Sequence, residues 1–368
     1  MKSIIGMVLM AVGIYSCGMS VKENDTDHNI VFTDKSGVFI PEWVDSVYYL
    51  KLQTCEDAFL SHLSKVIFKN DRIYIGDFVH HKIVVYRSDG SFGFSIDKKG
   101  RGPDEYLEIK SFSVDDSVIC LIDNYRRNLQ VYDAKTGNYI ATKSMPFIAW
   151  DLELLKKEVM AFAYSPLSGR KAVKNEPGGR LFFTDQKMKV LKTLFPFSAS
   201  ETDAVAKDAY FSSSRNQVVY NCCIDDNFYI IDQEQIDSIR KIVVDFGDKR
   251  VSAGGRRNLG GVNKRQKYLY ATPVVNGGYI AFDIAGPDYS ECYLYDCRRG
   301  KMASNPEENS WNMMSFPHGI DERGRFVYII ENKEYYDDLV ADGFVRASPD
   351  FERHLEDGIG VLLYVMKK

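Results

Sequence analysis

Two short stretches, each present twice, decide the fold predicted for this chain. Residues 73–77 read Ile-Tyr-Ile-Gly-Asp and residues 82–86 read Lys-Ile-Val-Val-Tyr. The pattern returns 46 residues later (73 to 119, 86 to 132), where 119–123 read Ile-Cys-Leu-Ile-Asp and 128–132 read Asn-Leu-Gln-Val-Tyr. Each unit is an apolar strand ending in Asp, a polar turn, and a second strand ending in Tyr. Ser-Asp-Gly at 88–90 then supplies the residue types that a tight hairpin needs.

Weaker copies of this unit continue to the end of the chain. Units of 40–50 residues with about four strands each are typical of β-propeller blades. A helical period appears only at 334–340 and 350–355. The pattern therefore predicts an all-β fold, a single six-bladed β-propeller of four-stranded blades. The expected blades are 65–97, 109–144, 150–195, 210–245, 270–303 and a last blade from about residue 315.

An open ring of blades would expose unpaired strand edges. The chain ends with a long apolar strand at 359–365, and another strand pattern occupies 44–52 near its beginning. We therefore expect the N- and C-terminal strands to share one blade and close the ring.

The first residues read as an export signal. Met-Lys-Ser at 1–3 is a short basic start, and an apolar stretch occupies residues 4–15. About 12 apolar residues are too few for the ~20 that span a bilayer. Ile-Tyr-Ser-Cys at 14–17 resembles the bacterial lipobox, which implies that the mature protein begins at a lipidated Cys17. A plain secretory signal with Cys17 incidental is the alternative.

These features predict three segments. They are a signal peptide at 1–16, a lipidated tether at 17–30 and the propeller at 31–368. By the same resemblance, Gly18 where an Asp would signal inner-membrane retention favours the outer membrane, so we expect a cell-envelope protein that contacts the membrane through its lipid.

Composition narrows the functional classes. Hydrophobic residues make up 45% and aromatic residues 13% of the chain, and its net charge of −4 has mixed signs. No cluster of basic residues that would bind nucleic acid appears, so we expect no nucleic-acid partner. We also expect the protein to be a monomer. The cysteines have neither a disulfide framework nor zinc-site spacing. We predict no metal and no cofactor, and the redox states of Cys222, Cys223, Cys292 and Cys297 stay open.

A loop between the first two units carries a family resemblance. Residues 100–106 read Gly-Arg-Gly-Pro-Asp-Glu-Tyr. This resembles the GxGPGEY-type motif of the NHL-like six-bladed β-propeller lipoproteins of gut-type bacteria, with Asp104 where that family often has Gly. The resemblance implies the fold and an export route and assigns no activity. We interpret the motif as a structural inter-blade loop, formed by Gly100, Gly102, Pro103, Glu105 and Tyr106.

Basic residues recur at positions where ligands could bind. His80 and His81 lie in the turn of the first unit, and Arg126 and Arg127 lie in the equivalent turn of the next. On one rim they could hold an acidic ligand such as a uronate or a sulfate. The alternative is a pair of solvated turns. Arg256 and Arg257, in a glycine-rich loop, are a further candidate for such a rim, or part of a simple connector.

Asp recurs at the predicted strand ends, at Asp77, Asp123, Asp232 and Asp283. The spacing is not that of a calcium loop. We expect these carboxylates to accept backbone N–H groups in the turns.

No catalytic constellation can be argued from the sequence. We therefore expect a binding or recognition module for a glycan, a peptide or a protein partner. An enzyme that acts on glycans, a lyase or a hydrolase, is the alternative, because propellers host both. A scaffold subunit of an outer-membrane uptake complex is the third hypothesis.

Overall fold

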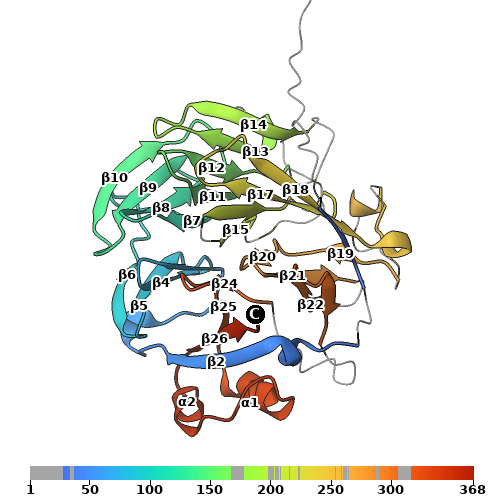
Figure 1. Ribbon diagram of the computed structural model, residues 1–368. Helices are drawn as coiled ribbons and strands as arrows, with labels where there is room; N and C mark the ends of the chain where they lie inside the picture. Colours follow the sequence, from blue (N-terminus) through green and yellow to red (C-terminus); the bar gives the residue numbers. More distant parts are fainter. Residues whose placement is uncertain are drawn as a thin grey trace, which may run out of the picture.

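Six separate sheets follow one another along the chain and surround a common axis (Figure 1). This arrangement confirms the predicted six-bladed β-propeller. The computed structural model describes residues 28–368 except 34–36, 167–177, 198–202, 204–206, 208, 215, 223, 253, 258, 260–262, 264, 287–289 and 306–315.

The first three blades are antiparallel meanders whose first strand lies nearest the axis. Blade 1 contains β3 (Lys65–Lys69), β4 (Arg72–Asp77), β5 (Lys82–Arg87) and β6 (Phe92–Ile96). Blade 2 contains β7 (Phe112–Val114), β8 (Val118–Asp123), β9 (Asn128–Asp133) and β10 (Tyr139–Ser144). Blade 3 contains β11 (Asp151–Leu154), β12 (Met160–Ala163), β13 (Gly179–Thr184) and β14 (Val190–Pro196).

The other three blades carry additions to this plan. Blade 4 contains β15 (Phe211–Ser214), β16 (Gln217–Tyr220), β17 (Asn227–Asp232), β18 (Ile239–Asp245) and the added β1 (His28–Val31). Blade 5 contains β19 (Tyr268–Leu269), β20 (Val274–Val275), β21 (Tyr279–Ala285), β22 (Ser290–Asp296) and β23 (Lys301–Ala303). Blade 6 contains β24 (Gly319–Ile320), β25 (Phe326–Ile330), β26 (Gly360–Met366) and β2 (Val44–Lys51).

Helices are short and few among the described residues. The two predicted helices are confirmed as α1 (Lys333–Ala341) and α2 (Pro349–His354), which follow β25 and precede β26. The 3₁₀ turns are η1 (Ile40–Trp43), η2 (Glu56–Ala58), η3 (Gly247–Lys249) and η4 (Gly255–Arg257).

The ring is closed by strands from both ends of the chain, as predicted. β2 pairs antiparallel with β26, from Val44 opposite Met366 to Lys51 opposite Gly360. A turn of blade 1 presses on the end of β2, where a Cβ at Gly90 would lie 2.0 Å from the Lys51 carbonyl oxygen. Gly90 also has φ +85°, so this contact accepts only glycine.

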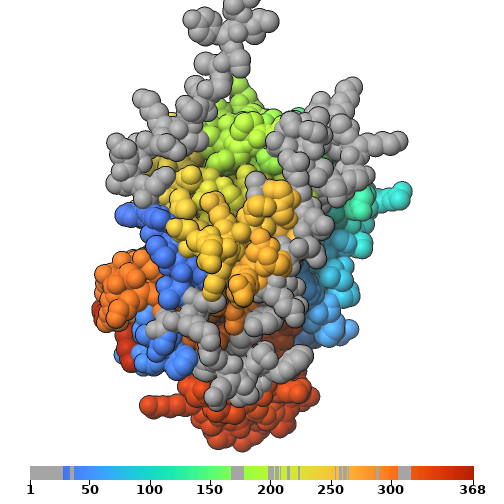
Figure 2. Space-filling view, turned by 90° about the vertical axis from the view of Figure 1, so that its right-hand side faces the viewer, coloured from blue at the N-terminus to red at the C-terminus, as the bar shows by residue number. Residues whose placement is uncertain are grey.

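The N-terminal segment contacts blades 4 and 5 before it reaches that closure in blade 6. β1 pairs in parallel with β18 of blade 4, and Phe39 forms an isolated bridge with Ser304 just after blade 5. The blue N-terminal residues cross the surface between the yellow part of blade 4 and the red C-terminal helices (Figure 2). β1 begins at His28, inside the stretch expected to be a tether.

The position of a strand within a blade explains its sequence pattern. β4 and β8 are buried along almost their whole length, because both of their faces pack on neighbouring blades. Ile73 and Ile75 belong to the core shared with blade 6, whereas Tyr74 belongs to the core shared with blade 2. β10, at the outer edge, alternates between half-buried and exposed residues. A continuous apolar run therefore marks an inner strand.

The repeated Asp and Tyr bind the connector that enters their own blade. The Asp77 carboxylate accepts the Ser61 N–H at 2.9 Å, and Asp123 accepts the Leu107 N–H at 2.8 Å. The Tyr86 hydroxyl donates to the Ala58 carbonyl at 3.3 Å. In the next unit, the Tyr132 hydroxyl donates to the Asp104 carbonyl at 3.0 Å. The residues and their partners recur at the same offset. The sequence repeat therefore reflects one conserved set of hydrogen bonds, which joins the ends of the hairpin to the connector before each blade.

Three of the four repeated Asp residues accept backbone N–H groups in turns, as expected. The expectation is wrong for Asp283. This residue lies inside β21 opposite Cys292, because the strand continues to Ala285. Burial there raises the pKa of Asp283 to about 6, against the opposing hydrogen bond with Ser290 and the charge of Lys207.

Asp77 and Asp283 should therefore respond oppositely to pH. Hydrogen bonds from the His80 and Ser61 N–H groups and side chains overcome the effect of burial and lower the pKa of Asp77 to about 2. Its contribution to stability is present above about pH 4 and is lost as the pH falls toward 2. The pKa of Asp283 is raised, so its ionisation costs stability as the pH rises from about 4 to about 6.

We expect Asp283→Asn to raise the free energy of unfolding at pH 7 by about 1–3 kcal/mol and to have little effect near pH 4. Asp77→Asn should lower that free energy at pH 7. Urea unfolding of both variants at the two pH values checks this. A destabilised Asp283→Asn protein at pH 7 would contradict the assignment.

Candidate functional site

A partly open space of about 570 Å³ lies on the axis of the ring. Its wall includes residues of the innermost strand of every blade, from β3, β7, β11, β15, β20 and β24. We call this space the axial cavity. The inner strands bring together side chains that are far apart in the sequence, and this convergence makes the axis the candidate site.

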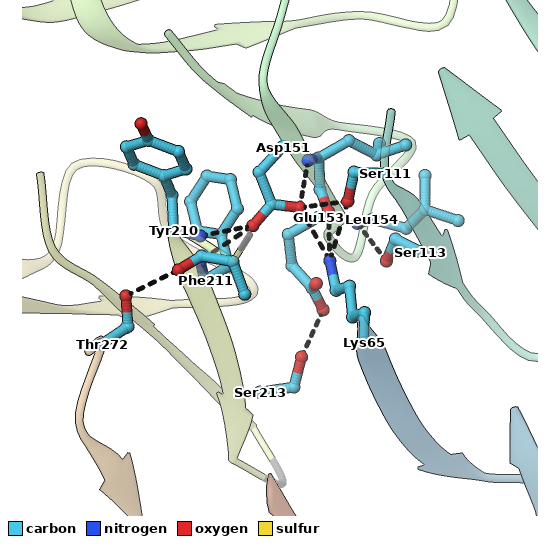
Figure 3. Close-up of polar contacts among 12 residues, drawn as sticks. Lys65, Ser111, Ser113, Asp151, Glu153, Leu154, Tyr210, Phe211, Ser213 and Thr272 are labelled. Carbon is cyan, nitrogen blue, oxygen red and sulfur yellow. Dashed lines mark hydrogen bonds and ion pairs between the residues drawn. The ribbon is translucent and has the colours of Figure 1, made fainter. Parts of the chain in front are cut away.

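Asp151 is the centre of a polar network at one end of the inner strands (Figure 3). One carboxylate oxygen accepts the Lys65 ammonium at 2.8 Å and the Ser111 hydroxyl at 2.5 Å. The other accepts the N–H groups of residues 210 and 211 at 2.7 and 3.0 Å. Asp151 is 0% exposed, so these donors replace the water that its charge has lost.

The same network reaches a further blade. The Thr272 hydroxyl donates to the Ala209 carbonyl at 3.1 Å, which links blade 5 to the segment that enters blade 4. We call the whole set the axial collar, comprising Lys65, Ser111, Asp151, residues 209–211 and Thr272. The collar joins five consecutive blades through hydrogen bonds around the axial cavity.

The Glu153 side chain lines the axial cavity two residues after Asp151 along β11. Its carboxyl group accepts the Ser213 hydroxyl at 2.6 Å. Burial raises the pKa of Glu153, against the opposing charge of Lys65 and the hydrogen bond from Ser213. The group is therefore shifted toward its neutral form, in which it can both donate and accept hydrogen bonds.

Lys207 and His318 also line the axial cavity. The Lys207 side chain is buried, and its ammonium donates to the side-chain oxygen of Asn221. His318 accepts the Ile329 N–H at its Nδ1 atom, and burial lowers its pKa to about 4. A neutral imidazole with an accepting Nδ1 carries its proton on Nε2, so His318 is a hydrogen-bond donor there.

The predicted histidines lie in the turn between β4 and β5, and each has a protein partner. His80 Nδ1 lies 2.5 Å from the Ser61 hydroxyl and 3.2 Å from the Asp77 carboxylate. His81 Nδ1 accepts the Ile109 N–H at 3.1 Å. Within the described residues, no group of three His, Cys, Asp or Glu side chains is arranged to hold a metal ion.

Arg126 is tied to the predicted motif loop. Its guanidinium donates to the carbonyls of Gly102 and Glu105 at 2.9 and 2.7 Å. Arg127, with φ 53°, uses its carbonyl to accept the Met145 N–H. The Arg126 guanidinium therefore binds carbonyl groups of the motif loop.

The motif loop itself is folded around Glu105. The Gly102 N–H donates to this carboxylate at 2.6 Å, and a Cβ at Gly100 would lie 2.1 Å from the same oxygen. Tyr106 is 0% exposed, and its hydroxyl lies 2.7 Å from the His81 carbonyl oxygen.

Two residues at the edge of the loop complete its contacts. The Pro103 carbonyl accepts the Thr142 hydroxyl at 3.3 Å. Asp104 has no positive φ, so the departure from the family's Gly needs no left-handed backbone.

The glycine-rich loop contributes Arg256 to a different place. Arg256 is buried and forms an ion pair with Asp226, which also accepts the Leu269 N–H at 3.0 Å. The Arg257 side chain lies outside the part of the structure that is described. The other five candidate rim residues are not assembled into one site by any described contact.

Cys17 and the whole signal segment lie outside the described residues. No helix in the described part of the chain is long and apolar enough to cross a bilayer. Cys223 is also outside the described residues, and Cys222 is buried.

Sequence reasoning missed the residues of the axial cavity. A signal was available, because Ser111 stands 46 residues after Lys65 and both lie at the axial collar. Asp151 and Glu153 also interrupt an otherwise apolar strand. Aligning the repeats by their first strands would have placed these polar residues at the axis.

The ring and its polar axial cavity define the class of protein, a six-bladed β-propeller. Within that class, the chain belongs to the family described as a domain of unknown function, DUF4934, whose model matches residues 27–356. No curated protein matches the chain.

Two solved structures from Bacteroides share the fold. A Bacteroides fragilis NCTC 9343 protein, named as exported, matches with a TM-score of 0.75 at 16% identity and covers 92% of this chain and 100% of its own. A member of the DUF4221 family from Bacteroides vulgatus matches with a TM-score of 0.50 at 11% identity and covers 88% of this chain and 98% of its own. At these identities the likeness concerns the fold alone.

Proposed function

We propose that this protein is a binding module of the bacterial cell envelope that holds its ligand in the axial cavity. The observation that carries the proposal is the cavity itself, whose 570 Å³ is walled by all six blades. Small-molecule sites in proteins have volumes of about 300–1,000 Å³. A ring closed by both ends of the chain also holds the lining groups in fixed positions, as recognition requires.

The hydrogen bonding of the axial carboxylates favours binding over hydrolysis. Both oxygens of Asp151 are occupied by protein donors, so this carboxylate is not available as a base or nucleophile. The Asp321 carboxylate in the wall is likewise paired with Arg325, and Glu322 accepts two backbone N–H groups, whereas hydrolysis of a glycan usually uses a pair of available carboxyl groups. Ligand recognition needs only the hydrogen-bonding capacity that Glu153 and His318 offer.

Filling the axial cavity tests this function. Ala271 is half-buried in the wall, so Ala271→Trp should occupy the space and abolish ligand binding. We would measure the melting temperature of residues 21–368 with neutral and acidic glycans and peptides, because a ligand of the native state raises it.

The matched control is Ile140→Trp on the exposed outer strand β10, which should bind as the native protein does. An unchanged ligand-induced shift in the Ala271→Trp protein would show that the ligand binds elsewhere.

We also propose that the protein is exported and anchored by a lipid on Cys17. The lipobox-like stretch supports this proposal. The Bacteroides fragilis protein that shares the fold is also named as exported. Cys17→Ser should move the protein from the membrane fraction to the soluble fraction, whereas Cys55→Ser should leave it on the membrane. Membrane association of the Cys17→Ser protein would refute the lipid anchor.

Three finer assignments belong to the same proposal. They are the outer membrane as the location, a monomeric state, and the relation to NHL-like propellers through residues 100–106. The contacts of Glu105 and Tyr106 support a structural role for that loop. The rim residues His80, His81, Arg126 and Arg127 are secondary to the axial cavity in this proposal, because they already bind protein groups.

A further inference from the structure

Most charged groups in the wall of the axial cavity are balanced within the protein. Lys65 is paired with Asp151 at 2.8 Å, and Asp321 is paired with Arg325 at 2.6 Å. The Glu322 carboxylate accepts the backbone N–H groups of Asn70 and Asp71. These groups need nothing from a ligand.

Lys207 is different. It is 8% exposed, and its ammonium donates to a neutral amide oxygen of Asn221 and forms no ion pair with any described residue. A buried ammonium whose hydrogen-bond acceptor is a neutral amide is costly, and an anion that binds it directly in the cavity would reduce that cost. Lys69, at the other end of β3, lies 3.9 Å from the exposed carboxylate of Asp116, so its charge is already screened by water.

An aromatic side chain lines the same cavity as Lys207. Tyr270 lines the axial cavity and is 43% exposed. The Thr272–Ala209 hydrogen bond joins the segment of Tyr270 to the segment of Lys207. The Tyr270 N–H donates to the carbonyl of Asp283, and Lys207 acts electrostatically on the carboxyl group of that same residue. The two side chains therefore belong to one region of the wall.

The remaining wall suits a polyhydroxylated ligand. Hydroxyl, amide and carboxyl groups face or border the space, from Ser212, Ser213, Asn216, Gln233 and Glu153. Such groups exchange hydrogen bonds with sugar hydroxyls, and an exposed aromatic face packs against the apolar face of a sugar ring.

We propose that the ligand of the axial cavity is an acidic saccharide, whose carboxylate binds the Lys207 ammonium and whose ring packs on Tyr270. This inference rests on the proposed binding function and specifies the chemistry of its ligand. The anionic group supplies a direct ion-pair partner for the Lys207 ammonium, and the sugar ring uses the neutral donors and acceptors around it.

Calorimetric titration of residues 21–368 with trisaccharides of galacturonate, glucuronate and mannuronate, beside neutral trisaccharides of the same size, tests the inference. We expect binding of at least one uronate series and weaker or no binding of its neutral counterpart. Lys207→Met should weaken uronate binding about tenfold or more, equivalent to about 1.4 kcal/mol. Tyr270→Ala should weaken it as well, and the control Lys69→Met should change it less than about twofold.

A stability measurement separates a ligand-binding lysine from a structural one. Lys207→Met should leave the free protein as stable as the native protein or more stable, because it removes a buried charge that forms no ion pair with a described residue. Lys207→Gln, which keeps a hydrogen-bond donor beside Asn221, provides a second variant that should lose uronate binding in the same way.

Three results would overturn the inference. They are equal affinity for neutral and acidic trisaccharides, uronate affinity unaffected by Lys207→Met and Lys207→Gln, or competition by inorganic sulfate with no preference for a sugar. Peptide binding that Ala271→Trp abolishes would overturn the acidic saccharide and leave the proposed function standing. If no tested glycan or peptide binds, both fail.

Discussion

Asp151→Ala is expected to lower the free energy of unfolding by about 3–5 kcal/mol, the usual cost of removing one partner from a buried ion pair. The substitution leaves the Lys65 ammonium buried without its carboxylate. In the native protein, the Ser111 hydroxyl and the N–H groups of residues 152, 210 and 211 donate hydrogen bonds to Asp151. The substitution leaves these four donors without their acceptor. Urea unfolding followed by tryptophan fluorescence measures the loss.

Lys65→Met is the informative control. It removes the ammonium and leaves Asp151 with four other donors, so we expect a smaller loss of about 1–2 kcal/mol. The asymmetry identifies Asp151 as the centre of the axial collar. Equal losses for the two variants would mean that the ion pair alone, and not the set of donors, holds the blades together at the axis.

Removal of β2 is expected to prevent stable folding. A chain that begins at residue 53 lacks the eight-residue strand β2, so the edge of β26 loses its partner and blades 6 and 1 lose their closure. An uncovered apolar strand edge also favours aggregation. Circular dichroism and size-exclusion chromatography of the purified chain would show the loss of the monomeric folded state.

A chain that begins at residue 33 provides the comparison. It lacks β1 and keeps β2, so it should fold with a modest decrease in stability, because β1 adds four residues to the outside of an already complete blade. If the chain that begins at residue 53 folds as a stable monomer, closure by the terminal strands is not what holds the ring together.

The fold could be predicted because its signals are local and repeated. The second strands of the blades, such as β4 and β8, are buried on both faces and have continuous apolar sequences. The Asp and Tyr at the ends of these hairpins make the same joint in successive blades, so they recur at one spacing. Asp283 was misplaced because the same residue type can also lie inside a longer strand, where the sequence gives no sign of the strand's end.

The candidate site was harder to predict because its contacts cross the axis. Lys65 and Asp151 are 86 residues apart, and Ser213 lies 60 residues from Glu153. No local pattern joins such positions. Sequence reasoning therefore favoured basic residues in visible turns, and the structure shows His80, His81 and Arg126 bonded to protein groups instead.

The path of the N-terminal segment has a mechanical consequence. A pulling force on that end of the chain reaches the four-residue β1 on blade 4 before it reaches the eight-residue β2 on blade 6. We expect the shorter strand to detach first, because fewer paired residues hold it, and its release to lengthen the chain before β2 is pulled. The pairing that closes the ring would then be the last of the two to bear tension.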